Sequence, residues 1–152
     1  MPLVEQAARD NPGVPGFRAT LALVLSATSR AEEARGLLEW AVASRFTEAP
    51  HDVTWLAVAC ILAEVSSRLE HVSAAAALYR ILEPWDGQIA YPAFGVWGPV
   101  ALYLGSLALV LGESEAAASH LSDATQAAVR AGAPRWEQRA AGETERLAQL
   151  AH

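Results

Sequence analysis

The amino-acid sequence predicts an all-α domain built from antiparallel helix pairs, and three observations support this prediction. Apolar residues recur at steps of three and four, as in Leu104, Ala108 and Leu111. No stretch alternates apolar and polar residues as a half-buried strand would. Alanine, leucine, glutamate and arginine, which favour helices, fill the long segments. The 152 residues suffice for a single domain, 1–152, with a core of its own.

The N-terminal part begins with a short helical segment, Leu3–Asp10, which prolines and glycines stop at positions 11–16. A lone helix leaves a face uncovered, which predicts a missing preceding repeat or contact with another chain. We therefore expect the chain to be a fragment of a larger protein, and a homo-oligomer stays open. The first full pair, about 17–45, consists of Phe17–Thr28 and Ala31–Ser44.

Two more pairs and a last helix follow. A connector at 46–51 leads to Asp52, a suitable cap for the pair at about 52–84, whose helices are Val53–Arg68 and Ser73–Glu83. The third pair, about 98–131, breaks at residues 112–114 and carries small residues on its facing sides. Because Gly132, Ala133 and Pro134 stop its second helix, residues 135–150 form a C-terminal capping helix.

The three pairs align as repeats of about 41 residues. The second helices superimpose Ala34, Ala75 and Ala117, then Leu38, Tyr79 and Leu121, then Ala41, Leu82 and Ala124. The first helices superimpose Leu21, Leu62 and Leu104, then Ala22, Ala63 and Gly105. This pattern resembles the tetratricopeptide repeat, although the spacing is longer and a large residue is missing early in the first helices. We therefore predict a tetratricopeptide-like solenoid with long connectors.

A second resemblance covers nearly the whole chain. Segments such as APHDVTWLAVACILAEVSSRLEH and GPVALYLGSLALVLGESEAAASHLSDATQAAVRAGAPRW resemble the C-terminal helical-repeat region of large bacterial signalling ATPases. In that family a nucleotide-binding module is joined to an adenylate or guanylate cyclase domain or to a LuxR-type DNA-binding domain. The resemblance implies a regulatory or sensory segment. Because none of the catalytic motifs of those modules is present, no cyclase, ATPase or DNA-binding activity is carried over.

Charge and composition restrict the partners. The net charge is −6, and the eleven basic residues are all arginines scattered singly, so we expect no direct nucleic-acid binding. The longest apolar run, Ala101–Leu111, is about half of a membrane span, so we expect no membrane contact. The single Cys60 and the absence of a secretory signal at the N-terminus predict a cytoplasmic domain.

The segment DGQIAYPAFGVW, residues 86–97, is an irregular connector with several aromatic side chains. These rings could clasp an apolar ligand or a partner helix. Alternatively, the connector covers the groove with its own side chains, since burying one aromatic residue is worth about 2 kcal/mol. The candidate binding residues, in the connector and on the first helices, are Trp55, Trp85, Tyr91, Phe94, Trp97, Tyr103 and Trp136, and Arg18 and Glu64 could join them on a concave face.

No pattern in the sequence predicts catalysis, a cofactor or a metal. The four histidines lack metal-ligand spacing and are expected at the surface, and Cys60 lies mid-helix without a basic neighbour, as a buried inert thiol would. The predicted function is therefore non-catalytic binding of a protein segment, or of other domains of the parent regulator, in signal transduction or transcription regulation. The alternative is a sensor that binds a small apolar ligand at residues 85–97.

Overall fold

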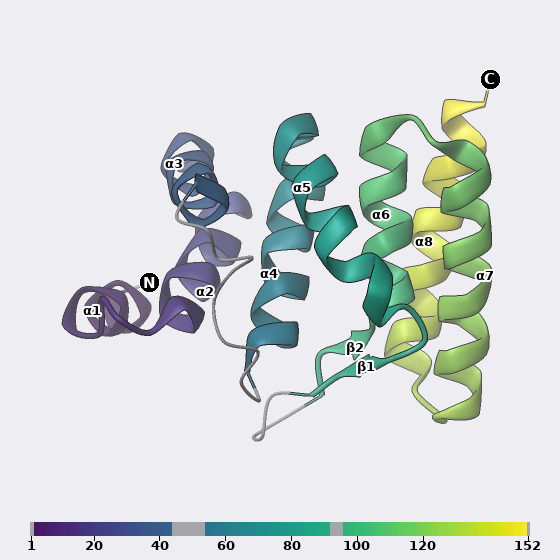
Figure 1. Ribbon diagram of the computed structural model, residues 1–152, viewed down its shortest axis with the longest axis horizontal. Coiled ribbons are helices and arrows are strands. Elements are labelled where there is room, and N and C mark those ends of the chain that lie inside the picture. The colour runs from purple at the N-terminus through teal and green to yellow at the C-terminus, as the bar shows by residue number, and fades with distance from the viewer. Residues whose placement is uncertain (1, 44–53, 92–95, 152) are drawn as a thin grey trace.

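The computed structural model describes residues 2–43, 54–91 and 96–151, and most of these are helical (Figure 1). The α-helices are α1 (Pro2–Asp10), α2 (Pro15–Ser26), α3 (Ala31–Ala43), α4 (Trp55–Arg68), α5 (Val72–Leu82), α6 (Val100–Leu111), α7 (Ser114–Arg130) and α8 (Pro134–Leu150). A short 3-10 helix, η2 (Glu83–Trp85), follows α5, and two small strands, β1 (Ile89–Ala90) and β2 (Gly98–Pro99), pair antiparallel. The all-α prediction is confirmed.

The main departure from the predicted elements lies between α5 and α6. Gly98 and Pro99 form β2 instead of starting a helix, and in the predicted irregular connector Ala90 pairs with Gly98 and Ile89 with Pro99. Gly98 has a φ of 129°, which glycine adopts readily, and Pro99 is extended. Helix α6 therefore begins only at Val100. The predicted cap Asp52 and the connector 46–51 lie outside the described residues.

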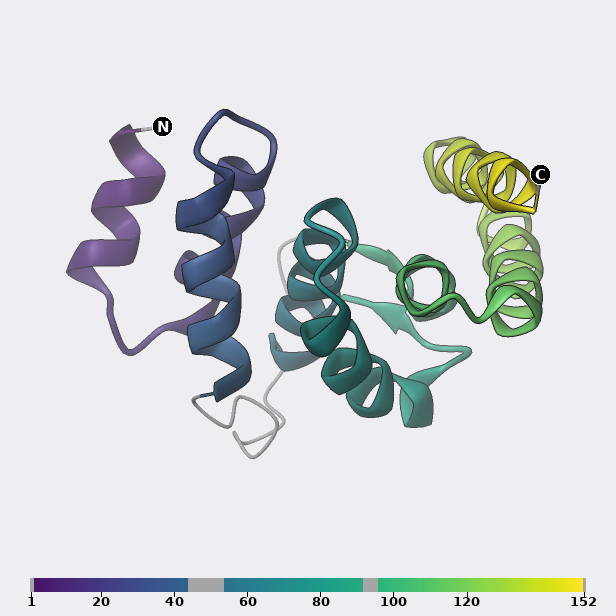
Figure 2. The ribbon, with the colours of Figure 1, turned by 90° about the horizontal axis from the view of Figure 1, so that it is seen from above.

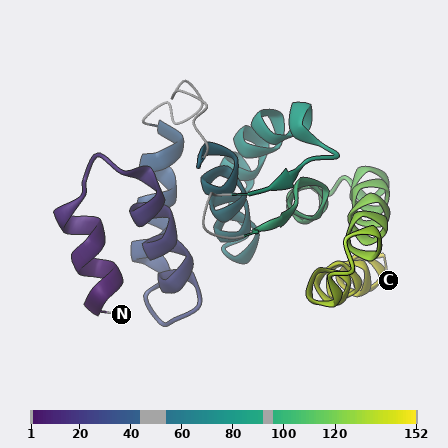
Figure 3. The ribbon, with the colours of Figure 1, turned by 90° about the horizontal axis from the view of Figure 1, so that it is seen from below.

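The helices follow one another in a curved row. Helix α2 packs on α3, α4 on α5, and α6 on α7. The first helices of these pairs also contact one another, with α2 packed on α4 and α4 packed on α6. Helix α1 packs on α2 at one end of the row. At the other end, α8 packs on α7 and turns back out of the row (Figures 2 and 3), so that it also contacts α6.

The core lies mainly around α4 and α6. Both helices are buried on most sides, because neighbours pack against them from several directions. Most positions that the repeat alignment made equivalent are buried, including Ala34, Ala75 and Ala117, whereas Leu21 and Tyr79 are half-buried. Gly105 of α6 faces Leu121 of α7 so closely that a Cβ atom there would lie 2.7 Å from the Leu121 side chain.

Two histidines expected at the surface are largely buried, so that expectation is wrong for them. The His71 ring accepts a hydrogen bond from the Ala74 amide (3.3 Å) and caps α5. His120 of α7 lies 2.8 Å from the Tyr79 hydroxyl of α5 and 3.1 Å from a carboxylate oxygen of Asp86. The side chains of these two histidines are each only 13% exposed. The other two histidines lie outside the described residues.

Candidate functional site

A groove runs along one face of α4. Ala57, Ile61, Glu64 and Arg68 recur at steps of four, three and four, which places them on a single stripe of the helix. Two hollows lie over this stripe, one of about 420 Å³ against α1 and α2 and one of about 570 Å³ against α2 and α8. Trp97 lines both hollows, so they adjoin at this residue, and the two together are here called the α4 groove.

The hollow against α1 and α2 forms the apolar end of the α4 groove. Its walls include Val4 of α1, Val14 and Phe17 at the start of α2, and Val58 and Ile61 of α4. Val14 is 47% exposed and Phe17 38% exposed. Apolar side chains gathered in a hollow and left partly exposed are typical of binding surfaces.

The hollow against α8 forms the charged end. Glu64 accepts a hydrogen bond from Arg68 (2.6 Å) and lies 3.2 Å from a guanidinium nitrogen of Arg139 on α8. The Glu64 side chain is only 13% exposed, which makes these ion pairs less screened than surface pairs. Burial alone would lower the pKa of Arg139, but the neighbouring Tyr103 and Glu64 raise it, so this arginine stays charged.

Tyr103 of α6 fixes the end of the connector against the charged end. Its buried hydroxyl donates a hydrogen bond to the Trp97 carbonyl (2.8 Å) and accepts one from Arg139 (3.4 Å). The Arg139 guanidinium also lies 5.6 Å from the Tyr103 ring centroid. Burial raises the pKa of Tyr103, so its hydroxyl keeps its proton at neutral pH and remains a donor.

Two indole rings border the groove. Trp97 and Trp136 are both half-buried, and both line the hollow against α8. The Trp136 ring lies against Gly98, where a Cβ atom would approach the indole nitrogen to 3.0 Å. The Trp97 indole nitrogen is shielded from solvent, yet it has no hydrogen-bond acceptor among the described residues. Such a buried donor without a partner is uncommon in a folded protein.

A smaller hollow of about 220 Å³ extends the charged end along α8, where Arg146 and Glu143 line it. Arg146 reaches α4, lying 3.3 Å from the Ser67 hydroxyl and 3.0 Å from Glu70. Over both hollows of the charged end, the charged side chains are four arginines and two glutamates: Arg68, Arg135, Arg139, Arg146, Glu64 and Glu143. Glu70, which pairs with Arg146, adds a third carboxylate, so arginines exceed glutamates by one at the charged end of a chain whose net charge is −6.

The structure brings together three of the predicted site residues, Trp97, Tyr103 and Trp136. Trp55 is buried at 4% exposure and packs against Trp85, with ring centroids 5.8 Å apart, and neither lines the α4 groove. Tyr91 is 58% exposed and likewise does not line it. The remaining candidate, Phe94, lies outside the described residues.

The arginines of the charged end were not predicted as site residues. A signal for them exists in the sequence, because Arg135, Arg139 and Arg146, with Gly142 between them, follow steps of four, three and four along α8. This stripe shows that the three arginines share one face of a helix. It does not show that this face lies opposite Glu64 and Arg68 of α4, since that depends on how α8 packs.

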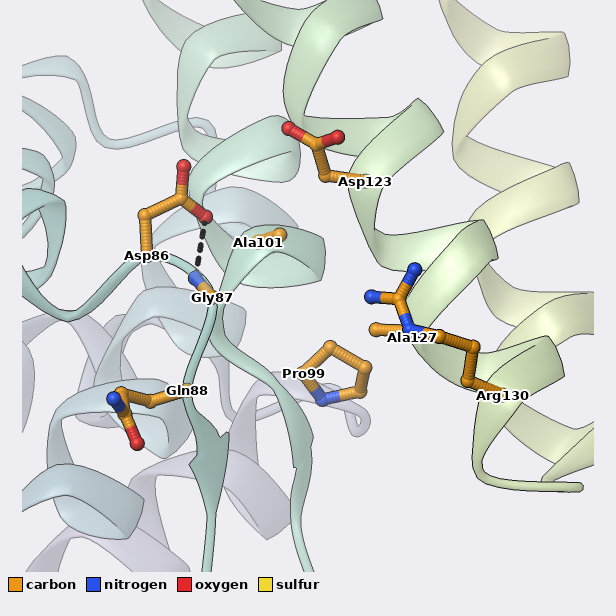
Figure 4. Close-up of a pocket in the computed structure, with 8 residues that line it drawn as sticks. All are labelled: Asp86, Gly87, Gln88, Pro99, Ala101, Asp123, Ala127 and Arg130. Carbon is orange, nitrogen blue, oxygen red and sulfur yellow. Dashed lines mark hydrogen bonds between the residues drawn. The ribbon is translucent and has the colours of Figure 1, made fainter.

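A separate hollow of about 370 Å³ lies between the turn after η2 and helix α7 (Figure 4). Asp86, Gly87 and Gln88 line one side, and Asp123 and Arg130 of α7 line the other. The Asp86 carboxylate accepts a hydrogen bond from the Gly87 amide (3.1 Å). Because none of the predicted binding residues lines this hollow, the α4 groove is the stronger candidate site.

No protein-family model matches the chain, and no curated protein or solved structure is significantly similar to it. Within residues 2–43, 54–91 and 96–151, no group of histidine, cysteine, aspartate and glutamate side chains is placed to hold a metal ion. Nor does any helix in this part of the chain combine the length and apolar character needed to cross a membrane.

Proposed function

We propose that this chain is a non-catalytic helical-repeat domain that binds a segment of another protein along the α4 groove. The observation that carries the proposal is the groove itself, which joins a partly exposed apolar end, two indole rings and a charged end. From Ala57 to Arg68 the helix rises about 16 Å. This length accommodates about five residues of an extended chain.

We further propose that the helix pairs are tetratricopeptide-like repeats of a solenoid, with α8 as its cap. The alignment of the three helix pairs at about 41 residues supports this, as does the packing of α2 on α4 and of α4 on α6, the first helices of successive pairs. Solenoids of helix pairs bind extended partners on their concave face. Helices α2, α4 and α8, which line the α4 groove, are the first helices of their repeats and the cap.

The resemblance to the repeat region of bacterial signalling ATPases supports a role for this binding in a regulator. In this proposal the domain is cytoplasmic, and the bound segment comes from other domains of the parent regulator or from an effector protein. The domain then acts by holding that segment, and the chain needs no catalytic group or cofactor of its own.

Selection of short random peptides on the immobilised chain tests the proposal. We expect enriched peptides that bind with micromolar affinity, measured by fluorescence anisotropy. Val14→Ser, which changes an exposed wall residue of the groove, should weaken binding, whereas Val129→Ser, on an exposed site of α7, should not. Failure to enrich any peptide, or equal effects of the two variants, would contradict the proposal.

A second candidate function, sensing a small apolar molecule, is favoured by one observation. The apolar end has a volume of about 420 Å³, within the range of ligand pockets, and Trp97 lines it. Trp97→Ala separates the possibilities. A sensor should keep its melting temperature and lose binding of an apolar metabolite found by mass spectrometry of the purified chain. A tryptophan that only fills the groove should instead lower the melting temperature when it is removed.

A further inference from the structure

The charged end of the α4 groove contains more positive charge than its own carboxylates balance. Arg68 and Arg139 share the single carboxylate of Glu64, at 2.6 and 3.2 Å. One ionised carboxylate neutralises one guanidinium, so the cluster keeps one positive charge. Arg135, which is exposed on the first turn of α8, has no ion-pair partner among the described residues and adds a second.

This positive charge lies at one end of the groove only. Along α4 the floor changes from Ala57 and Ile61 to Glu64 and Arg68. Arg135 and Arg139 of α8 face the charged end and do not line the apolar end. The groove therefore has a direction, apolar against α1 and positive against α8.

We propose that the segment bound in the α4 groove is acidic at one end and apolar at the other. This inference rests on the proposed function and specifies its partner. The apolar side chains of the segment lie between Phe17 and Ile61, and its aspartate or glutamate side chains lie against Arg135 and Arg139. Guanidinium groups suit this role because they bind carboxylates with two parallel hydrogen bonds.

The Trp97 ring marks the junction of the two ends, because it lines both hollows. The segment then crosses Trp97 with its apolar part on one side and its acidic part on the other.

Peptide selection on the intact chain tests this inference through the composition of the selected peptides. We expect aspartate or glutamate clustered at one end and leucine, isoleucine or aromatic residues at the other. Replacing the peptide's acidic residues by their amides should weaken binding about fivefold on the native chain. The same replacement should change little on Arg135→Gln, whereas Arg130→Gln on α7, outside the groove, should behave like the native chain.

The outcomes separate this inference from the proposed function. Peptides that bind in the groove without an acidic preference, or amide replacements that act equally on the native chain and on Arg135→Gln, would overturn the inference and leave the proposed function standing. If no peptide is enriched, both fail. Sedimentation of the chain alone tests whether a second copy of the chain occupies the α4 groove. A dimer that Val14→Ser and Arg135→Gln dissociate would replace the acidic segment with the chain itself.

Discussion

Replacing Gly105 by alanine should destabilise the protein, although the same change usually stabilises a helix. In a helix interior, glycine to alanine is worth about 1 kcal/mol of stabilisation. At Gly105 the new Cβ atom would lie 2.7 Å from two Leu121 side-chain atoms and 3.4 Å from the Leu121 backbone nitrogen. Leu121 is 1% exposed and has little room to move. Overpacking of this kind costs about 1–3 kcal/mol, which equals or exceeds the gain in helix propensity.

Gly36→Ala is the matched control. Gly36 lies inside α3 and is exposed, and a Cβ atom at this position would meet no other atom within 4 Å. We expect Gly36→Ala to raise the free energy of unfolding by about 1 kcal/mol. Urea unfolding followed by circular dichroism measures both variants. The difference between them should be about 1–3 kcal/mol, or roughly 2–12 °C in melting temperature for a chain of this size.

A second substitution shows whether Leu121 causes the effect. Leu121→Ala alone should cost about 2–5 kcal/mol, because it empties a buried site. In the Gly105→Ala background it should cost less, since the shorter side chain makes room for the new Cβ atom. Leucine at Gly105 or Ala117 should separate α6 from α7 further. If Gly105→Ala stabilises the protein as much as Gly36→Ala does, the close packing of α6 on α7 and the repeat register are both wrong.

Three further predictions concern the core and the connector. Burial raises the pKa of Cys60, so the unfolded chain loses this proton at lower pH than the folded chain, and stability falls as pH rises above about 9. Between pH 9 and 10 the native chain should lose about 1 kcal/mol more than Cys60→Ala in urea unfolding, and identical losses would refute this. Tyr103→Phe should cost about 1–2 kcal/mol because the Trp97 carbonyl loses its donor, while Tyr91→Phe, at an exposed site, should leave the melting temperature unchanged. Gly98→Ala should lower the free energy of unfolding by about 1–3 kcal/mol, because alanine is strained at a φ of 129° and its Cβ atom would press on Trp136. Gly13→Ala is the control, because a Cβ atom there meets no other atom within 4 Å, and thermal melts compare the two variants.

The helical elements were predictable because their signals are local. Apolar spacing and the Gly112 and Gly132 breaks placed α6, α7 and α8 to within one or two residues of their observed limits. The start of α6 was predicted two residues early. There, Gly98 and Pro99 pair with residues 89 and 90 in a small sheet, a contact between segments that helix periodicity does not report.

The candidate site was only partly predictable. Aromatic content selected Trp97, Tyr103 and Trp136, which the structure brings to the α4 groove, but it also selected Trp55 and Trp85, which pack against each other. An aromatic residue has the same signature in a sequence whether its ring fills the core or borders a groove. Only the packing of its neighbours separates the two roles.

The sequence by itself determined that this chain is helical and where most helices begin and end, because both depend on residues a few positions apart. The tertiary structure alone decided where charge accumulates. Arginines that are scattered singly in the sequence meet at the charged end, and Arg139 reaches Glu64 across 75 positions only because α8 turns back toward α4. Coulomb interactions depend on distance in space, and the curvature of the row of helices sets that distance.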